Sequence, residues 1–200
     1  MTGGQGVGQR QRQKLIGKAC RGDEAAFLLL YKEHREPIFR FVYRMLGSIE
    51  AAEDITHECF LSLIVRADRF DPTRASLRTY LLAAARNLSF KHLRKYGGEV
   101  TVEEMSQDAR LSFDEAPLHK LISEERARQV RNAISNLPPL QREVVILFQY
   151  EELSLAEISS VVGADIGTVK SRLHRAREGL RRSLASYFKS DSAVVIEGSY

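Results

Sequence analysis

The chain has 200 residues, of which 44% are hydrophobic and 28% are charged, and its formal net charge is +4. This composition is typical of a soluble protein with one domain or two small ones, and so mild a positive excess does not by itself establish a nucleic-acid partner. No apolar run approaches the roughly 20 residues that cross a bilayer, and the stretch from Met1 to Lys18 lacks the apolar core of a signal peptide. We therefore expect a cytoplasmic protein that does not insert into a membrane.

Helices are predicted along nearly the whole chain, because apolar residues recur at three- and four-residue spacing and strict alternation is scarce. After a flexible N-terminal arm, residues 1–21, the first helical domain is expected over residues 22–96. Its predicted helices run from Ala26 to Leu46, where Pro37 kinks or divides the helix, from Ala51 to Ala67, and from Ser76 to Tyr96. The turn Gly47-Ser48 and the break Asp71-Pro72 separate these helices.

An acidic stretch follows over residues 97–121, with several carboxylates against Arg110 as its one basic residue before Pro117. Its weak periodicity predicts a flexible linker, and a plain solvated spacer is the simplest reading. A second helical domain is expected over residues 122–188, with helices from Leu140 to Tyr150, from Leu155 to Val162 and from Ile166 to about Tyr187. Residues 189–200 are predicted to form a flexible tail.

The segment from Ser154 to Lys170 has the pattern of a helix-turn-helix. Ser154 and Glu157 are spaced as a capping box, Gly163 suits the end of the first helix, and Asp165 suits the start of the second. In the second helix Val169, Leu173 and Ala176 are expected to pack inward. The outward residues are then Thr168, Lys170, Ser171, Arg172, His174, Arg175 and Arg177. A basic helix of this kind can enter a major groove, although a charge run alone is also compatible with a merely solvated helix.

Two parts of the sequence resemble one family. The stretch from Leu137 to Ile146, Leu155-Ala-Glu-Ile158 and the run from Gly167 to Arg177 resemble region 4 of the extracytoplasmic-function (ECF) sigma factors, in the sigma-70 family. Ala52-Glu-Asp-Ile-Thr-His-Glu58, Arg69-Phe-Asp71, Leu77-Arg-Thr-Tyr-Leu81 and Ala85-Arg-Asn-Leu88 with His92-Leu-Arg94 resemble region 2 of the same family. The two matches stand in the family's order and are joined by a variable linker.

The resemblance implies an all-α protein of two small helical domains, the region 2 bundle and the region 4 helix-turn-helix. It implies a subunit that binds RNA polymerase core, directs it to promoter DNA, and is controlled by an anti-sigma factor. Region 4 would read the −35 element through the outward residues named above. Region 2 would recognise and open the −10 element, for which the candidates are Arg74, Ser76, Arg78, Thr79, Tyr80, Arg86, Asn87, Lys91 and Arg94. For Tyr80, packing in the core is an equally simple alternative.

Glu53, Asp54, His57 and Glu58 form one polar, mainly acidic face on a predicted helix. Such a face is often just solvated, but the resemblance makes it the surface that binds the polymerase core. Several positions depart from the family pattern: His57 stands where Gln is usual, Ile64 and Tyr80 where Trp is frequent, Leu77 where Phe is frequent, and Ala83 where a basic residue is common. Fewer aromatic and basic groups are thus left for melting promoter DNA.

A stand-alone helix-turn-helix repressor or activator is the alternative, and it predicts a dimer on a palindromic site. No enzyme motif is present: the sequence contains no P-loop, no HExxH and no nucleophile motif. Cys20 and Cys59 form no CxxC pair, and the histidines show no metal spacing. We therefore expect no catalytic residue, no cofactor, no metal site and no small-molecule substrate.

Overall fold

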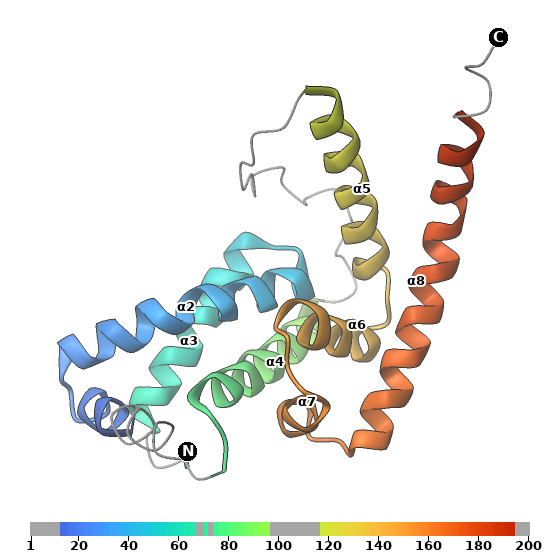
Figure 1. Ribbon diagram of the computed structural model, residues 1–200. Helices are drawn as coiled ribbons and strands as arrows, with labels where there is room; N and C mark the ends of the chain where they lie inside the picture. Colours follow the sequence, from blue (N-terminus) through green and yellow to red (C-terminus); the bar gives the residue numbers. More distant parts are fainter. Residues whose placement is uncertain (1–12, 67–69, 72–73, 97–116, 195–200) are drawn as a thin grey trace, which may run out of the picture.

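The protein is seen in a computed structural model that describes residues 13–66, 70–71, 74–96 and 117–194, with side chains over 13–66, 70–71, 74–96 and 125–185. Every regular element in these ranges is a helix. The all-α prediction is confirmed. In Figure 1 the helices of the first half, in blue to green, lie against those of the second half, in yellow to red, and α7 lies beside α4.

The first half contains α2 (Glu24–Leu46), α3 (Ile49–Val65) and α4 (Leu77–Tyr96), which pack on one another in all three pairs. Each begins at a side-chain cap: Asp23 accepts from the amide of Ala26, Ser48 from Ala51, and Ser76 from Thr79. Such caps satisfy amides that the first turn of a helix leaves without a carbonyl partner. The helix α2 continues through Pro37, so of the two predicted effects, a kink or a division, the structure excludes the division.

The predicted flexible arm, residues 1–21, needs a correction in its second part. Residues 13–19 are helical, and Ile16 and Ala19 are buried in the hydrophobic core beside the residues of α2 and α3. The apolar face of this short helix is only two turns long and is surrounded by glycines and basic residues, so its periodicity is weak in the sequence. Residues 1–12 lie outside the described part of the chain.

The second half contains α5 (Pro117–Ser135), α6 (Pro139–Val145), η3 (Ile146–Tyr150), α7 (Leu155–Val162) and α8 (Ile166–Val194). The helix predicted from Leu140 to Tyr150 is continuous, but its second part, η3, has π-helical hydrogen bonding. α5 begins inside the predicted linker 97–121, of which residues 97–116 are not described. α8 continues past the end expected near Tyr187 and into the predicted tail 189–200, because the stretch between Tyr187 and Val194 contains no Gly or Pro.

One hydrophobic core runs through both halves. Phe41, Met45 and Leu82 from the first half belong to the same buried cluster as Val144 and Ile158 from the second. Contacts between the halves are made by α4 with α7 and by α2 with α5, α6 and η3. The two sequence regions therefore pack as neighbours rather than as separate bodies.

Candidate nucleic-acid interface

The helix-turn-helix predicted from Ser154 to Lys170 is confirmed in its geometry. The Ser154 hydroxyl accepts from the Glu157 amide at 3.3 Å, and the Glu157 carboxylate accepts from the Ser154 amide at 2.9 Å, which is a complete capping box. Hydrogen bonds from the hydroxyl and the amide of Ser154 lower the pKa of the Glu157 carboxyl. Gly163 ends α7 with φ 66°, a left-handed conformation that glycine adopts without steric cost.

Asp165 caps α8 as the sequence predicted. Its carboxylate accepts from the Thr168 amide at 2.9 Å and from the Thr168 hydroxyl at 2.6 Å, and these bonds, the hydroxyl's first, lower the pKa of Asp165. Val169, Leu173 and Ala176 are buried against the rest of the domain, again as predicted. This packing fixes which side of α8 faces solvent.

The outward residues of α8 fall into two groups. Lys170, Ser171, His174, Arg175 and Arg177 are exposed and lie on one basic surface, which we call the α8 basic face. Thr168 is half-buried in the cap with Asp165. Arg172 is also half-buried, and its guanidinium donates to the Glu143 carboxylate at 3.1 Å. Arg172 thus holds α8 against α6, a role that sequence analysis did not assign to it.

Glu143 lies at the point where both halves meet. Its side chain is 0% exposed, and besides Arg172 it accepts from Arg86 of α4 at 2.7 Å. Burial raises the pKa of the Glu143 carboxyl, while the hydrogen bond and charge of Arg86 and the charge of Arg172 act in the opposite direction. Because an unpaired buried carboxylate is very costly, the two arginines stabilise the charged form of this group.

Glu151, which follows η3, is a second buried carboxylate. Its side chain is 3% exposed and is paired with Arg78 of α4 at 2.8 Å and with Arg44 of α2 at 3.7 Å. The Arg44 guanidinium also lies 4.3 Å from the ring centroid of Tyr150. Burial is the main cause of a lowered pKa at Arg44, which Glu151 partly offsets.

The predicted −10 residues at the start of α4 have local partners. Ser76 and Thr79 bond to each other through their hydroxyls at 2.8 Å, and the Ser76 hydroxyl caps the helix. Thr79 is buried. Tyr80 packs edge-on against Phe70, with ring centroids 5.2 Å apart, in agreement with the core-packing alternative. Arg74 is exposed and pairs with Asp71 at 3.3 Å.

The remaining −10 candidates on α4 differ in exposure. Asn87, Lys91 and Arg94 are exposed, whereas Arg78 and Arg86 are engaged by the buried glutamates. Arg86 also donates to Asn87 at 3.2 Å and lies 4.5 Å from the ring centroid of Phe90. The structure therefore gathers these residues on one helix but leaves only some of them open.

The predicted acidic face is open. Glu53, Asp54, His57 and Glu58 are all exposed on α3, and the His57 ring stacks on Tyr31 with centroids 6.3 Å apart. Leu61 and Val65 continue this face along the helix and are 61% and 78% exposed. This arrangement offers a partner both carboxylates and an apolar edge.

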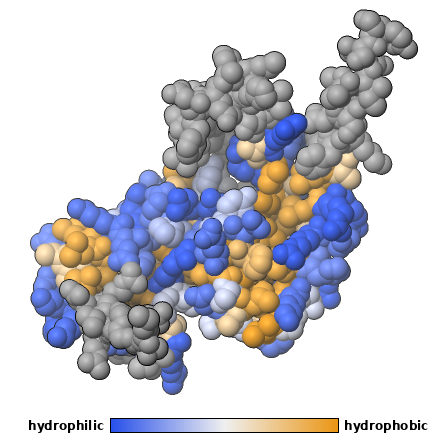
Figure 2. All heavy atoms as spheres, viewed as in Figure 1, coloured by the Kyte–Doolittle hydropathy of each residue, from blue (hydrophilic) through white to orange (hydrophobic). Residues whose placement is uncertain are grey.

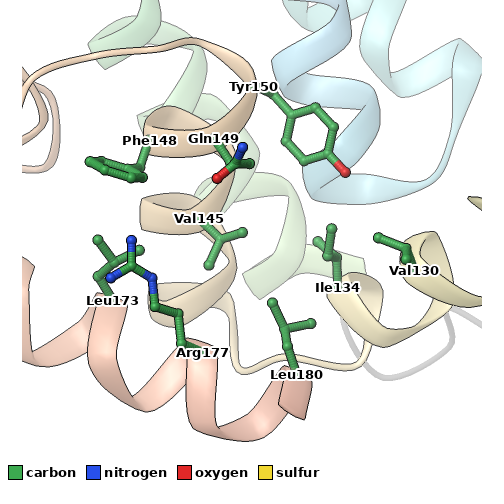
Figure 3. A pocket seen from close by; sticks show the side chains of 9 residues that line it. All are labelled: Val130, Ile134, Val145, Phe148, Gln149, Tyr150, Leu173, Arg177 and Leu180. Atoms are coloured by element: carbon green, nitrogen blue, oxygen red, sulfur yellow. The ribbon is translucent and has the colours of Figure 1, made fainter. Parts of the chain in front are cut away.

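A hydrophobic groove lies in the second half between α5, η3 and α8. Figure 3 shows Val130 and Ile134 on one side of it and Phe148 and Leu173 on the other, with Val145 between them. Arg177 belongs to its wall, and its guanidinium lies 5.4 Å from the centroid of the Phe148 ring. In Figure 2 hydrophobic surface gathers along this side of the molecule, between the central helices and α8.

Two negative findings concern the described residues alone. Among them, no three His, Cys, Asp or Glu side chains are grouped so that they could hold a metal ion. Within the same part of the chain, no helix has the length and apolar character required to cross a membrane.

Sequence reasoning missed Glu143, Glu151 and Arg44. A signal existed for Glu143, because it precedes the apolar residues Val144 and Val145 and stands four residues before the buried Leu147. A carboxylate on the buried stripe of a helix indicates an ion pair in the interior. Nothing in the sequence identified its partner on α4.

Family models match both parts of the chain. Residues 30–99 match the model described as Sigma-70 region 2, and residues 127–180 match the model described as Sigma-70, region 4. The two matches cover most of α2, all of α3 and α4, and most of the second half, in the order that the sequence predicted.

Two curated relatives match over nearly their whole length. The ECF RNA polymerase sigma factor SigW of Bacillus subtilis is 34% identical over 180 residues, which are 86% of this chain and 96% of the relative. The RNA polymerase sigma-H factor of Pseudomonas aeruginosa is 30% identical over 184 residues, or 88% of this chain and 95% of the relative.

Solved structures share the fold. CnrH, in a complex with the cytosolic domain of CnrY, superimposes with a TM-score of 0.64 at 22% identity, over 86% of this chain and 96% of CnrH. The sigma factor RpoE of Bartonella quintana, in a complex with the anti-sigma factor NepR, superimposes with a TM-score of 0.61 at 24% identity, over 80% and 96%. With two regions matched in order and relatives covered almost end to end, this chain belongs to the ECF sigma factors of the sigma-70 family.

Proposed function

We propose that this sigma factor binds RNA polymerase core through its first half and carries it to promoters that both halves recognise. The observation that supports this proposal is the pairing of two open surfaces of opposite charge: the acidic face of α3 and the α8 basic face. An acidic face attracts a basic protein partner, and a basic helix in a helix-turn-helix attracts DNA.

The acidic face is assigned to the polymerase core, with Glu53, Asp54, His57 and Glu58 as contact residues. The α8 basic face is assigned to the −35 element. There the side chains near the start of α8, Lys170, Ser171 and His174, are placed to meet base edges, and Arg175 and Arg177 to meet phosphates. Arg172 supports this helix from inside through Glu143.

The −10 element is assigned to α4. Asn87, Lys91 and Arg94 are available at its surface, and Arg74 stands before its start. Ser76 and Thr79 act on this surface by fixing the first turn of α4. Tyr80 packs on Phe70, which limits the ring surface that it can offer to an unstacked base.

Regulation by an anti-sigma factor is part of the proposal. The similar structure of RpoE was solved with the anti-sigma factor NepR, and that of CnrH with a domain of CnrY. We also assign all chemistry to the polymerase, so this chain has no catalytic residue, cofactor or small-molecule substrate of its own. Its place of action is the cytoplasm, where promoter DNA is available.

The test is a pull-down of purified polymerase core followed by run-off transcription from genomic fragments. Transcripts that depend on the chain, with start sites that share −35 and −10 sequences, are the expected result. Binding to a palindromic site as a dimer, without core binding and without transcripts, would instead establish a stand-alone repressor or activator.

A further inference from the structure

The short helix of residues 13–19 lies outside the part of the chain that matches the region 2 model, which begins at residue 30. Ile16 and Ala19 form its buried side, and the Cys20 thiol donates to the Leu63 carbonyl oxygen at 3.9 Å. These contacts hold the helix against the end of α3, where Figure 1 shows it in dark blue. The helix therefore has a fixed orientation and a fixed outer side.

The outer side of this short helix is basic. Lys14, Gly17 and Lys18 are spaced at i, i+3 and i+4, which places them on one face of the helix. Arg21 follows in the next turn, and its guanidinium lies 3.5 Å from the place that a Cβ atom of Gly17 would occupy. Lys14, Lys18 and Arg21 are exposed, and we call these three residues the N-terminal basic face.

The N-terminal basic face has no acidic partner among the residues that the structure describes. The neighbouring carboxylate of Asp23 accepts from the Ala26 amide and so caps α2. Lys14 and Lys18 stand at i and i+4, where like charges destabilise a helix. In a helix of only two turns this repulsion is a cost that an anionic ligand would remove.

The N-terminal basic face adjoins the surface that we assign to the −10 element. The chain leaves α3 at Arg66, which is exposed, and soon afterwards Phe70 packs on Tyr80 in the first turn of α4. Arg74, which is also exposed, stands before that turn. The short helix and the start of α4 are thus both attached to the same end of α3, so one strand of DNA can reach both.

The charge of this face favours DNA over polymerase core as its partner. We assign the acidic face of α3 to the core, and a core surface that attracts carboxylates is itself basic. Such a surface would repel Lys14 and Lys18. Phosphates suit them, because the lysine ammonium pairs with a phosphate as a point charge and needs no particular base.

We propose that the N-terminal basic face binds the phosphates of promoter DNA that flanks the −10 element, and so extends the contact of the first half beyond that element. The proposal rests on the function assigned above to α4. Lys14 and Lys18 neutralise phosphates and release their counterions. Arg21, lying across Gly17, adds a guanidinium that can donate to one phosphate through two nitrogens.

The test compares Lys18→Gln with Lys32→Gln in the full-length chain assembled with polymerase core. Both lysines are exposed, and both changes remove one charge while keeping a residue of similar helix propensity. Lys32 lies on α2 outside the N-terminal basic face, so the two variants differ only in where the charge is lost. Lys18→Arg, which keeps the charge, is expected to bind DNA as the wild type does.

Three single-stranded fragments of a promoter mapped by the run-off experiment serve as probes. One ends at the −10 element on both sides, and the others continue by about eight nucleotides on the 5′ or on the 3′ side. Fluorescence anisotropy at several salt concentrations gives the slope of log K against log salt. On one of the two longer fragments the slope should be less steep by about 0.7 for Lys18→Gln than for Lys32→Gln, and on the shortest fragment the two slopes should be equal.

Each other outcome has a distinct meaning. Equal slopes for Lys18→Gln and Lys32→Gln on every fragment would overturn the proposed phosphate contact, and a difference on the shortest fragment would overturn its position beside the −10 element. A loss of affinity for polymerase core in Lys18→Gln would assign the face to core instead. Wild-type chain with core that binds none of the fragments and makes no transcript would overturn the proposed function itself.

Discussion

The exposed basic residues of α8 differ from Arg78 and Arg86 of α4 in what they contact within the chain. On α8, Lys170, Arg175 and Arg177 are exposed, whereas on α4 the guanidinium groups of Arg78 and Arg86 bind Glu151 and Glu143. In the sequence the two helices cannot be distinguished in this respect, because both are rich in arginine. The difference shows that the exposure of a basic residue to DNA depends on whether a carboxylate of the same chain forms an ion pair with it.

Glu143→Ala tests the buried ion pairs and is expected to have the largest effect. It leaves Arg86 and Arg172 without their buried carboxylate, so we expect the free energy of unfolding to fall by about 3–5 kcal/mol. Urea unfolding followed by circular dichroism measures the change. Glu152→Ala is unsuitable as a control because Glu152 has a positive φ of 52°; Glu152→Asn removes the same charge with less strain, and an equal loss in both variants would contradict the role of Glu143.

Arg175→Ala tests the exposed α8 basic face, and Arg172→Ala tests the ion pair with Glu143 that holds α8 against α6. Arg175 is exposed and is assigned to phosphates, so its loss should weaken binding to a −35 duplex and to an unrelated duplex about equally, without changing unfolding. Arg172→Ala should lower stability as well, because Arg172 pairs with Glu143. Fluorescence anisotropy and urea unfolding distinguish the two, and an Arg172 variant of wild-type stability would remove the support that we assign to it.

Replacing both Asp54 and Glu58 by Lys tests the acidic face of α3, which is exposed although α3 belongs to the same half of the chain as α4. We expect association with polymerase core to slow by about tenfold, because charge attraction accelerates encounter. Binding of −35 DNA by the helix-turn-helix should be unchanged. Surface plasmon resonance with immobilised core gives the rate, and a variant that binds core as fast as wild type would reject this face as the interface.

Ser154→Ala is expected to have the smallest effect, a loss of about 1 kcal/mol in the free energy of unfolding. The pKa of Glu157 is lowered in the folded state by its bonds from Ser154, so this stabilisation is present above the unfolded pKa and is lost as pH falls through the folded one. The difference between wild type and variant should therefore shrink in acid. Ser160→Ala, which removes a hydroxyl that donates to the Ala156 carbonyl, is the control.

Much of the fold could be predicted from the sequence because it depends on local patterns. The capping box at Ser154, the left-handed Gly163 and the buried Val169 and Leu173 all follow from spacings of a few residues. The weakest local patterns gave the errors, namely the short helix around Ile16 and the boundaries of α5 and α8.

The contacts between the halves could not be predicted in the same way. Arg86 and Glu143 are 57 positions apart, and Arg78 and Glu151 are 73 positions apart. Such pairs leave no periodic trace, and any of the many charges in the chain was an equally good partner on sequence alone. Which candidate residues are exposed, such as Lys170 and Arg175 on α8, and which are paired, such as Arg78 and Arg86 on α4, therefore depended on tertiary packing.

The guanidinium of Arg142 has a consequence for how this protein can vary. It donates to the main-chain carbonyls of Met45, Ser135 and Leu137, so it joins the end of α2 to the turn before α6 through atoms that every residue possesses. The bonds therefore do not depend on which side chains stand at those three positions, although Met45 and Leu137 are also held by their burial in the core. At position 142 itself a lysine has only one nitrogen and cannot reach three carbonyls in this arrangement. The three bonds therefore require arginine at position 142, whereas they require no particular side chain at the positions that accept them.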